Sequence, residues 1–267
     1  MDFDYLRFLA RVGASHIHPY EKSATDILIK ELKLNHGHKA LEIGCGTGGT
    51  IVRICGRYKV HLYGVDRLDE MLAAAGKRIR LTGLSRQVCL FKGDISALPF
   101  DSGTFDRAYA ESVLGILSSE KVEAVLDEVY RVLDEQGIFV LNDAIWKAAV
   151  SPEQVQAING ACLEDFGLLQ ASEAAWSLED WKEIFQRHGF RVRSLLIEDS
   201  IESGKDSIRG AMNWREMVSE GMTRGYKIMG YLNRGLLAEK RKYDELLERH
   251  RDDGKYIESR IFVLTKE

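Results

Sequence analysis

Cysteine, proline and long apolar runs are scarce in this chain of 267 residues, and each scarcity excludes a class of protein. The four cysteines form no C-x-x-C pair, so the sequence indicates neither a zinc site nor a disulfide framework. Three prolines leave little material for a proline-rich linker or tail. No apolar run approaches the roughly 20 residues of a membrane-spanning helix, so we expect no membrane insertion.

An excess of charge of one sign is also lacking, because the chain has 37 basic and 41 acidic residues and a net charge of −4. Binding to nucleic acid usually needs a clustered positive surface, so we expect no nucleic-acid partner. The hydrophobic share of 45% is typical of a globular protein with a full core. The N-terminal residues show no signal-peptide pattern, and we therefore expect a cytoplasmic protein.

What is present is an alternation of short apolar strands with helices. The expected strands are 40–43, 60–65, 88–92, 105–110, 137–141, 190–198 and 256–265. The expected helices between them are 50–58, 69–81, 119–133 and 177–188, with further helix in 23–34, 142–175 and 205–252. This alternation predicts an α/β fold in which a mostly parallel sheet is flanked by helices.

The change of rhythm after Leu141 predicts that two helical insertions interrupt the sheet-forming core. The expected segments are a helical cap at 1–35, a ligand-binding core at 36–145, a helical lid insertion at 146–176, a continuation of the core at 177–204, a second helical insertion at 205–252 and a final core strand at 253–267. Methionines and aromatic residues in the second insertion favour packing, an acceptor chamber or a homodimer contact.

The first strand runs into Gly44-Cys45-Gly46-Thr47-Gly48-Gly49, which contains the pattern G-x-G-x-x-G. Glycines let the backbone turn sharply and approach a ligand closely, with a helix N-terminus facing it. Asp66 ends the second strand, where a carboxylate can accept hydrogen bonds from both hydroxyls of a ribose. These features alone fit a dinucleotide as well as other nucleosides.

Glu42 distinguishes a dinucleotide ligand from other nucleosides. It precedes Gly44 by two residues and therefore lies on the same face of the strand. A carboxylate there would repel the pyrophosphate of a dinucleotide. It would attract a ligand that carries an ammonium and a sulfonium. Glu42 therefore favours a cationic nucleoside over NAD, and an NAD-dependent dehydrogenase is the weaker hypothesis.

Four segments in order carry a family resemblance: LEIGCGTGG, YGVDRLDEML, FKGDISALPFDSGTFD and VYRVLDEQGIFVLND. They resemble the motifs of class I S-adenosylmethionine-dependent methyltransferases. HIHPYEKSATDILIKEL is similar to the first helix of the UbiE-like small-molecule group. The resemblance implies a Rossmann-like sheet of seven strands, with the last strand antiparallel, helical insertions as a lid and S-adenosylmethionine at the strands' carboxyl ends. Asp134–Gly137 departs from the family's usual Lys/Arg-Pro-Gly-Gly turn, which lies far from the cofactor.

The resemblance also assigns roles to residues. The glycines would lie under the methionine part of the cofactor, Asp66 would hold the ribose, and Asp94 and Ile95 would bind the adenine. The complete expected cofactor set is Tyr20, Glu42, Gly44, Cys45, Gly46, Gly48, Asp66, Arg67, Met71, Asp94, Ile95 and Glu111. For Met71, packing between helix and sheet is an equally good explanation.

The acceptor side is less defined by the sequence. Methyl transfer by in-line displacement needs alignment and exclusion of water, and a base only when the acceptor must lose a proton. Glu111 is the best candidate for steering a cationic acceptor or taking a proton. The other expected acceptor-side residues are His18, Asn142, Trp146 and Trp176. For His18, Trp146 and Trp176, structural roles are equally good or better explanations. Such a rim suits a compact polar or aromatic small molecule.

Two further alternatives stay open. The chain could methylate a protein or an RNA, or it could be a catalytically silent scaffold that binds the cofactor. No Cys/His or H-E-x-x-H constellation is present, so we expect no metal in the site.

Overall fold

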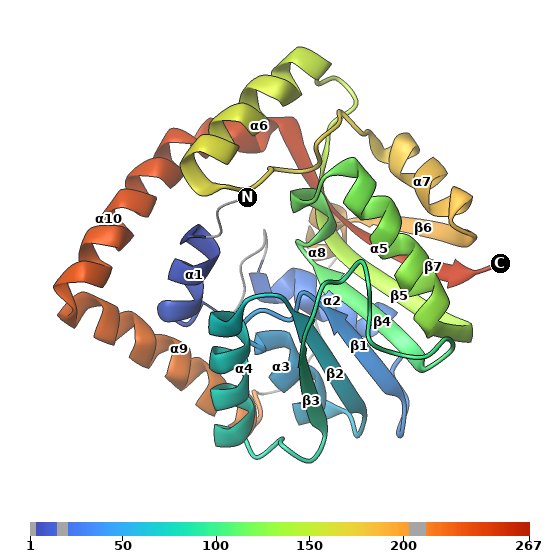
Figure 1. Ribbon diagram of the computed structural model, residues 1–267, viewed down its shortest axis with the longest axis horizontal. Helices are drawn as coiled ribbons and strands as arrows, with labels where there is room; N and C mark the ends of the chain where they lie inside the picture. The colour runs from blue at the N-terminus through green and yellow to red at the C-terminus, as the bar shows by residue number, and fades with distance from the viewer. Residues whose placement is uncertain (1–3, 15–20, 203–211) are drawn as a thin grey trace.

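The computed structural model describes residues 4–14, 21–202 and 212–267, which form a seven-stranded sheet with helices on both faces (Figure 1). The strand order is β3-β2-β1-β4-β5-β7-β6. The strands are β1 (Lys39–Ile43), β2 (His61–Asp66), β3 (Val88–Lys92), β4 (Phe105–Glu111), β5 (Leu133–Trp146), β6 (Phe190–Leu196) and β7 (Ile257–Lys266).

The first five strands pair in parallel, and β7 runs antiparallel between β5 and β6. The predicted Rossmann-like sheet of seven strands with an antiparallel last strand is therefore confirmed. The direction in which strands are added to the sheet reverses at β1: β2 and β3 lie on one side of β1, and β4 and β5 lie on the other. Ligands of open α/β sheets bind at the carboxyl ends of the strands at such a reversal.

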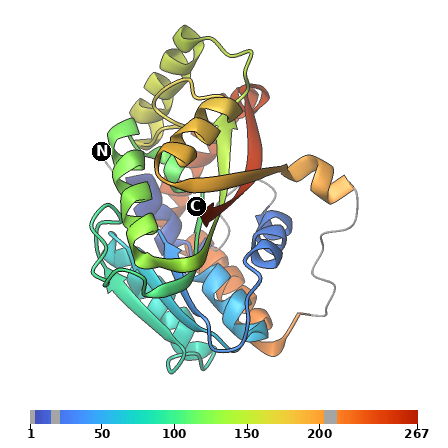
Figure 2. The ribbon, with the colours of Figure 1, turned by 90° about the vertical axis from the view of Figure 1, so that its right-hand side faces the viewer.

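Helices cover the two faces in separate groups (Figures 1 and 2). One face packs against α5 (Ser119–Val132) and α7 (Leu178–Arg187). The other face packs against α2 (Glu21–Glu31), α3 (Gly49–Arg57), α4 (Asp69–Leu81) and α8 (Ile197–Glu202). Side chains alternate along each strand, so both faces of the parallel strands are buried, as a doubly covered sheet requires.

The connection from β3 to β4 contains no helix among the described residues, and aromatic rings cover that part of the sheet. Phe100 meets Phe91 and Phe105 edge to face, with ring centroids 5.1 and 4.9 Å apart, and Tyr63 joins the same cluster. Arg131 donates to the Phe100 carbonyl at 2.7 Å and fixes the loop. Edge-to-face pairs contribute roughly 0.5–1.5 kcal/mol beyond their buried area.

The fifth strand is longer than the sequence indicated. The predicted strand 137–141 extends to Trp146, and the helix expected from residue 142 begins only at α6 (Pro152–Phe166). The reason is tertiary pairing, because Asn142–Trp146 form an antiparallel ladder with Ile257–Ile261 of β7. Ser151 then starts α6 with a capping box that also involves Gln154.

Among the described residues, three further helices frame one side of the molecule: α1 (Asp4–Arg11), α9 (Trp214–Leu232) and α10 (Arg234–Arg249) (Figure 1). Two short 3-10 helices complete the described part of the chain, η1 (Leu114–Ile116) after β4 and η2 (Arg251–Tyr256) before β7. Tyr243 of α10 packs its ring 4.9 Å from both Tyr5 and Phe8 of α1. Within residues 4–14, 21–202 and 212–267, no helix has the length and apolar character needed to cross a membrane.

Candidate functional site

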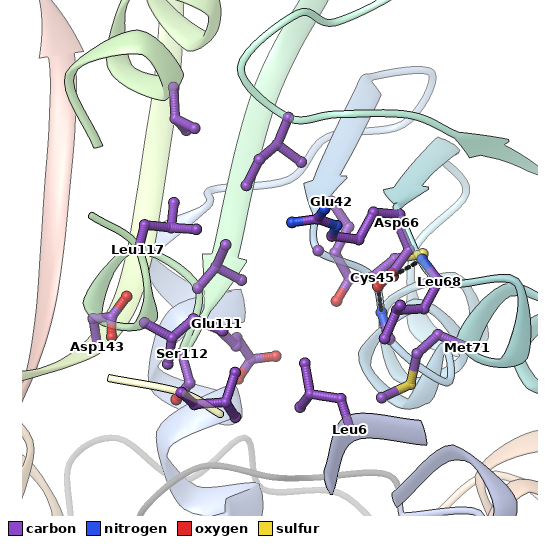
Figure 3. Close-up of a pocket in the computed structure, with 18 of the residues that line it drawn as sticks. Leu6, Glu42, Cys45, Asp66, Leu68, Met71, Glu111, Ser112, Leu117 and Asp143 are labelled. Carbon is purple, nitrogen blue, oxygen red and sulfur yellow. Dashed lines mark hydrogen bonds between the residues drawn. The ribbon is translucent and has the colours of Figure 1, made fainter. Parts of the chain in front are cut away.

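A cavity of about 380 Å³ lies at the carboxyl ends of β1, β2, β4 and β5, beneath α1 (Figure 3). Figure 3 shows Glu42, Asp66, Leu68 and Met71 on one side and Ser112, Leu117 and Asp143 on the other. The volume is within the usual range for small-molecule sites, about 300–1,000 Å³. The cavity is therefore the candidate functional site.

The glycine loop forms the floor of this cavity. Gly44, Gly46 and Gly48 have φ angles of 68°, 49° and 75°, which side-chain-bearing residues rarely adopt. A Cβ atom at Gly44 would also lie 2.7 Å from Cγ2 of Val113. Both backbone conformation and space therefore require glycine at position 44, and the loop exposes backbone to the cavity.

Asp66 ties this loop to the end of β2. Its Oδ2 accepts from the Gly46 backbone N–H at 2.8 Å, and its Oδ1 accepts from Leu68 N–H at 2.9 Å. Burial raises the pKa of Asp66, and the hydrogen bonds from Leu68 and Gly46 oppose that rise. The carboxylate is thus fixed at the cavity wall, and the second lone pair of each oxygen can accept from a ligand.

Glu42 is buried beside the glycine loop, with 4% of its surface exposed. Its Oε2 has no hydrogen-bond partner among the described residues, although the residue lines the cavity. Burial raises the pKa of Glu42 well above its ordinary value, and the charges of Glu111 and Asp66 raise it further. The Tyr109 side chain opposes this rise in the pKa. A buried carboxyl oxygen without a partner is costly, so the position of Oε2 favours a cationic or hydrogen-bond-donating ligand.

Glu111 is the last residue of β4 and faces Glu42 from the other side of the cavity (Figure 3). Its Oε1 accepts from the Thr50 hydroxyl at 2.6 Å, and its Oε2 accepts from the Thr25 hydroxyl at 2.8 Å. The next residue, Ser112, has a φ of 53° and donates its N–H to the Asn142 carbonyl. Two helices therefore fix the orientation of the Glu111 carboxylate at a strained turn.

Asp143 of β5 also lines the cavity. Its Oδ2 accepts from the Leu114 N–H at 2.8 Å, and its Oδ1 accepts from Ala144 N–H at 3.1 Å. Complete burial raises the pKa of Asp143 to about 6, against the lowering effect of these backbone donors. The carboxyl thus holds η1 against β5 at the wall of the cavity.

Asp94 lies at the far end of the cavity, after β3. Its Oδ1 accepts from the backbone N–H and the hydroxyl of Ser96, at 3.0 and 2.7 Å. These hydrogen bonds lower the pKa of Asp94. Lys121 approaches Oδ2 at 3.8 Å, and Ile95 lines the adjacent wall. This end therefore combines an ionised carboxylate with an apolar surface.

Arg78 connects the glycine loop to an outer helix. Its guanidinium is 1% exposed and donates to the Thr47 carbonyl at 2.9 Å and to the Ser219 carbonyl of α9 at 3.0 Å. It also donates to the Ser219 and Thr223 hydroxyls. Burial lowers the pKa of Arg78 to about 10. The position of α9 is thereby linked to the floor of the cavity.

Most of the residues that the sequence indicated for cofactor binding lie around this one cavity. Those that line it are Glu42, Gly44, Cys45, Gly46, Asp66, Arg67, Met71, Asp94, Ile95 and Glu111. Gly48 lies behind the floor, where a Cβ atom would be 3.1 Å from Ala75. Tyr20 and His18 lie outside the described residues.

The expected acceptor-side residues of strand β5 and beyond do not line the cavity. Asn142 and Trp146 are each 1% exposed, and the Trp146 indole N–H donates to the Ser172 carbonyl at 3.2 Å. Trp176 packs edge to face on Trp181, with ring centroids 5.1 Å apart. The rim of Glu111, Asn142 and Trp146 is therefore not one surface, because Asn142 and Trp146 are buried within the long ladder between β5 and β7.

Other described residues form the rest of the wall. Leu6 of α1, Leu117, Lys121 and the turn Leu168–Gln170 line the cavity, although nothing in the sequence marks them for this role. Asp143, which the sequence places beside Asn142 at the end of the fifth strand, lines the cavity as well. The apolar pair Leu168 and Leu169 comes directly after Gly167, which ends α6 with a φ of 70°.

Comparisons with known proteins agree with this geometry. Residues 40–137 match a family model described as a methyltransferase domain. (+)-O-methylkolavelool synthase of Herpetosiphon aurantiacus is 30% identical over 137 residues, which cover 51% of this chain and 47% of that protein. 24-methylenesterol C-methyltransferase 2 of Oryza sativa subsp. japonica is 28% identical over 150 residues, or 55% of this chain and 39% of that one. The chain spans less than half the length of both relatives.

A solved structure shares the fold over nearly the whole chain. Phosphoethanolamine N-methyltransferase 2 of Haemonchus contortus, in complex with S-adenosyl-L-methionine, superposes with a TM-score of 0.68 at 16% identity. The superposition covers 97% of this chain and 56% of that one. At this identity the likeness establishes the fold of the chain and leaves its acceptor undetermined.

Proposed function

Since this chain belongs to the class I S-adenosylmethionine-dependent methyltransferases, we propose that it transfers the methyl group of that cofactor to a small molecule with an apolar body. The observation that carries this proposal is the division of the cavity into two walls. Glu42, Asp66 and the glycine loop form one wall, and mostly apolar side chains, with Glu111 and Asp143 among them, form the other (Figure 3). The first wall suits the cofactor and the second suits the acceptor.

The residues of the first wall fit S-adenosylmethionine. The partnerless Oε2 of Glu42 suits the ammonium of the methionine part, because a carboxylate and an ammonium stabilise each other when both are desolvated. The positive-φ glycines leave space for a ligand against the backbone. Asp66 suits the ribose hydroxyls, and Asp94 with Ile95 suits the edge and face of the adenine. Each polar feature of the cofactor thus has a complementary residue.

Bound S-adenosylmethionine supplies an electrophilic methyl group on a sulfonium whose departure leaves a neutral thioether. The chain's own residues then need only orient the acceptor and exclude water. Leu6 and Tyr5 of α1 cover the cavity, and Tyr243 of α10 holds α1 in place. Glu111, fixed by two threonine hydroxyls, is the carboxylate that would orient the acceptor or receive its proton.

The chemistry of the second wall supports an acceptor that is largely apolar. Its apolar members are Val113, Ile116, Leu117, Val125, Ala144, Leu168, Leu169 and Ile257. Its polar members are Glu111, Ser112, Lys121, Asp143 and Gln170. Because Asn142 and Trp146 are absent from this wall, we replace the expected polar or aromatic acceptor with one that has an apolar body and one or two polar groups. The name of the relative that acts on a 24-methylenesterol supports this class.

The proposal is tested by methyl transfer from radiolabelled S-adenosylmethionine into fractionated small-molecule extracts. We expect label in the apolar fraction, much slower labelling with Asp66→Ala protein at cofactor concentrations below saturation, and normal labelling with Asp69→Ala, whose carboxylate lies on the exposed surface. Label that enters only polymeric material would overturn the small-molecule assignment. Tight cofactor binding without transfer into any fraction would support a silent scaffold instead.

A further inference from the structure

A cluster of metal-binding side chains lies outside the cavity, where α6 meets the end of α10. Cys162 belongs to α6, His250 follows the last residue of α10, and Asp253 lies in the adjoining η2. One ligand atom from each residue lies within 4.8 Å of the others. The proposed methyl transfer uses none of these three side chains.

The distances within the cluster suit a tetrahedral ion. Cys162 Sγ lies 3.6 Å from His250 Nδ1. Ligands at about 2.3 Å for zinc–sulfur and about 2.0–2.1 Å for zinc–nitrogen would stand roughly 3.5 Å apart in a tetrahedral site. Asp253 Oδ2 lies 2.7 Å from the same Nδ1, so an ion would replace this contact and separate the two atoms slightly.

The second ring nitrogen of His250 is already oriented as in many metal sites. Nε2 lies 2.9 Å from Asp165 Oδ2, and Arg249 donates to the same carboxylate oxygen at 3.0 Å. A carboxylate on the distal nitrogen fixes the imidazole so that the other nitrogen can bind metal. Asp165 held by Arg249 therefore directs Nδ1 toward Cys162 and Asp253.

We propose that Cys162, His250 and Asp253 bind one zinc ion that joins α6 to the α10–η2 junction. The thiol proton of Cys162 leaves to solvent when the sulfur binds as thiolate. The proton between His250 Nδ1 and Asp253 leaves as well, while Nε2 keeps its proton toward Asp165, and a water completes the fourth position. The thiolate and the Asp253 carboxylate balance the two charges of the ion, while Arg249 balances Asp165. The mixture of sulfur, nitrogen and oxygen ligands favours zinc over magnesium or calcium, which prefer oxygen alone.

The ion would stabilise the segments that cover the cavity, which are the turn after α6 and the pair of helices α1 and α10. Gln170 lines the cavity, and its Oε1 lies 3.6 Å from Cys162 Sγ. The ring of Phe166 in α6 packs at a tilt against both His250 and Tyr5, with ring centroids 5.2 and 5.1 Å away. Zinc would therefore hold the turn after α6 and the α1–α10 pair in one arrangement. This role does not depend on methyl transfer.

The test uses tag-free, full-length protein stripped with a chelator and titrated with zinc alone in a calorimeter, without cofactor. We expect one zinc per chain with a dissociation constant below about 1 μM. Cys162→Ser and Asp253→Asn should each weaken binding at least tenfold. Cys89→Ser, which changes an exposed cysteine on β3, should leave it unchanged.

A second readout covers the case in which the variants fold poorly. In wild-type protein, zinc should protect Cys162 from alkylation, followed by mass spectrometry, while Cys89 stays reactive. Cobalt in place of zinc should give the absorption band of a thiolate ligand. Absence of saturable binding, or zinc binding without protection of Cys162, would overturn the proposal and would leave the methyltransferase assignment unaffected.

Discussion

Glu42 of β1 and Glu111 of β4 line one cavity from adjacent strands, and the charge of Glu111 adds to the effect of burial in raising the pKa of Glu42. Threonine hydroxyls hold both oxygens of Glu111, whereas Oε2 of Glu42 has no partner among the described residues. The protein thus stabilises the Glu111 carboxylate, whereas Glu42 would ionise when a cationic ligand binds beside its Oε2.

Without cofactor, the free energy of unfolding of Glu42→Gln protein should increase relative to that of wild type as the pH rises. In wild-type protein the folded state keeps a proton on Glu42 at pH values where the unfolded chain has lost it. The folded state therefore binds more protons, and its stability falls as the pH rises from the ordinary carboxyl pKa toward the raised one. Glutamine removes this dependence, so the stability difference between variant and wild type should grow from pH 5 to pH 8 in urea unfolding.

The same variant should bind S-adenosylmethionine at least tenfold more weakly by calorimetry, since charge-assisted hydrogen bonds contribute about 1.5–3 kcal/mol. An equal stability difference at both pH values would show that Glu42 is ionised in the free protein. Unchanged cofactor affinity would place the ammonium elsewhere in the cavity.

Gly44→Ala should destabilise the protein more than Gly103→Ala does. Both glycines have a φ of 68°, but a Cβ at Gly103 meets nothing within 4 Å, whereas one at Gly44 meets Val113. Gly103→Ala should cost about 1–2 kcal/mol for backbone conformation alone. Gly44→Ala should cost a further 1–3 kcal/mol, roughly, from overpacking. Adding Val113→Ala should recover part of that excess in urea unfolding, and no recovery would mean that the clash is relieved elsewhere.

Asp66→Ala should weaken binding of S-adenosylhomocysteine by at least ~1.5–3 kcal/mol, because the ribose loses its acceptors and Gly46 and Leu68 lose a shared partner. The control is Asp69→Ala, three residues later on the exposed start of α4. Calorimetry comparing the two variants checks the prediction. Equal affinities would remove Asp66 from the site.

The sequence predicted the sheet and the cofactor wall because both follow from local patterns. Strand periodicity, the glycine loop and the carboxylates at strand ends are all encoded within a few neighbouring residues. The acceptor wall could not be predicted in the same way, since Leu6, Leu117 and Leu168 come together only through tertiary packing. The position of Trp146 could not be predicted from local sequence either. Pairing with β7 extends its strand, and the buried indole bonds to the Ser172 carbonyl.

Arg78→Met should destabilise the protein by about 2–5 kcal/mol, because the Thr47 and Ser219 carbonyls would lose a buried donor. Arg80→Met, on the exposed side of the same helix, should stay within about 0.5 kcal/mol of wild type in urea unfolding. Hydrogen exchange should also become faster in α9 in the Arg78 variant alone. Equal stability of the two variants would show that the buried network contributes little net energy.

Glu111→Gln should keep the fold and most of the cofactor affinity but slow methyl transfer at least ~10-fold, about 1.4 kcal/mol of barrier. The amide is the same size and can still accept from one of the two threonines, so packing around Thr25 and Thr50 should persist. What it loses is the negative charge that would orient the acceptor or take its proton. Single-turnover rates on the acceptor identified by labelling check the prediction, with Glu120→Gln on the exposed start of α5 as the control. Full turnover by Glu111→Gln would mean that positioning alone carries the reaction, with the Glu111 carboxylate serving only to hold α2 and α3 against β4.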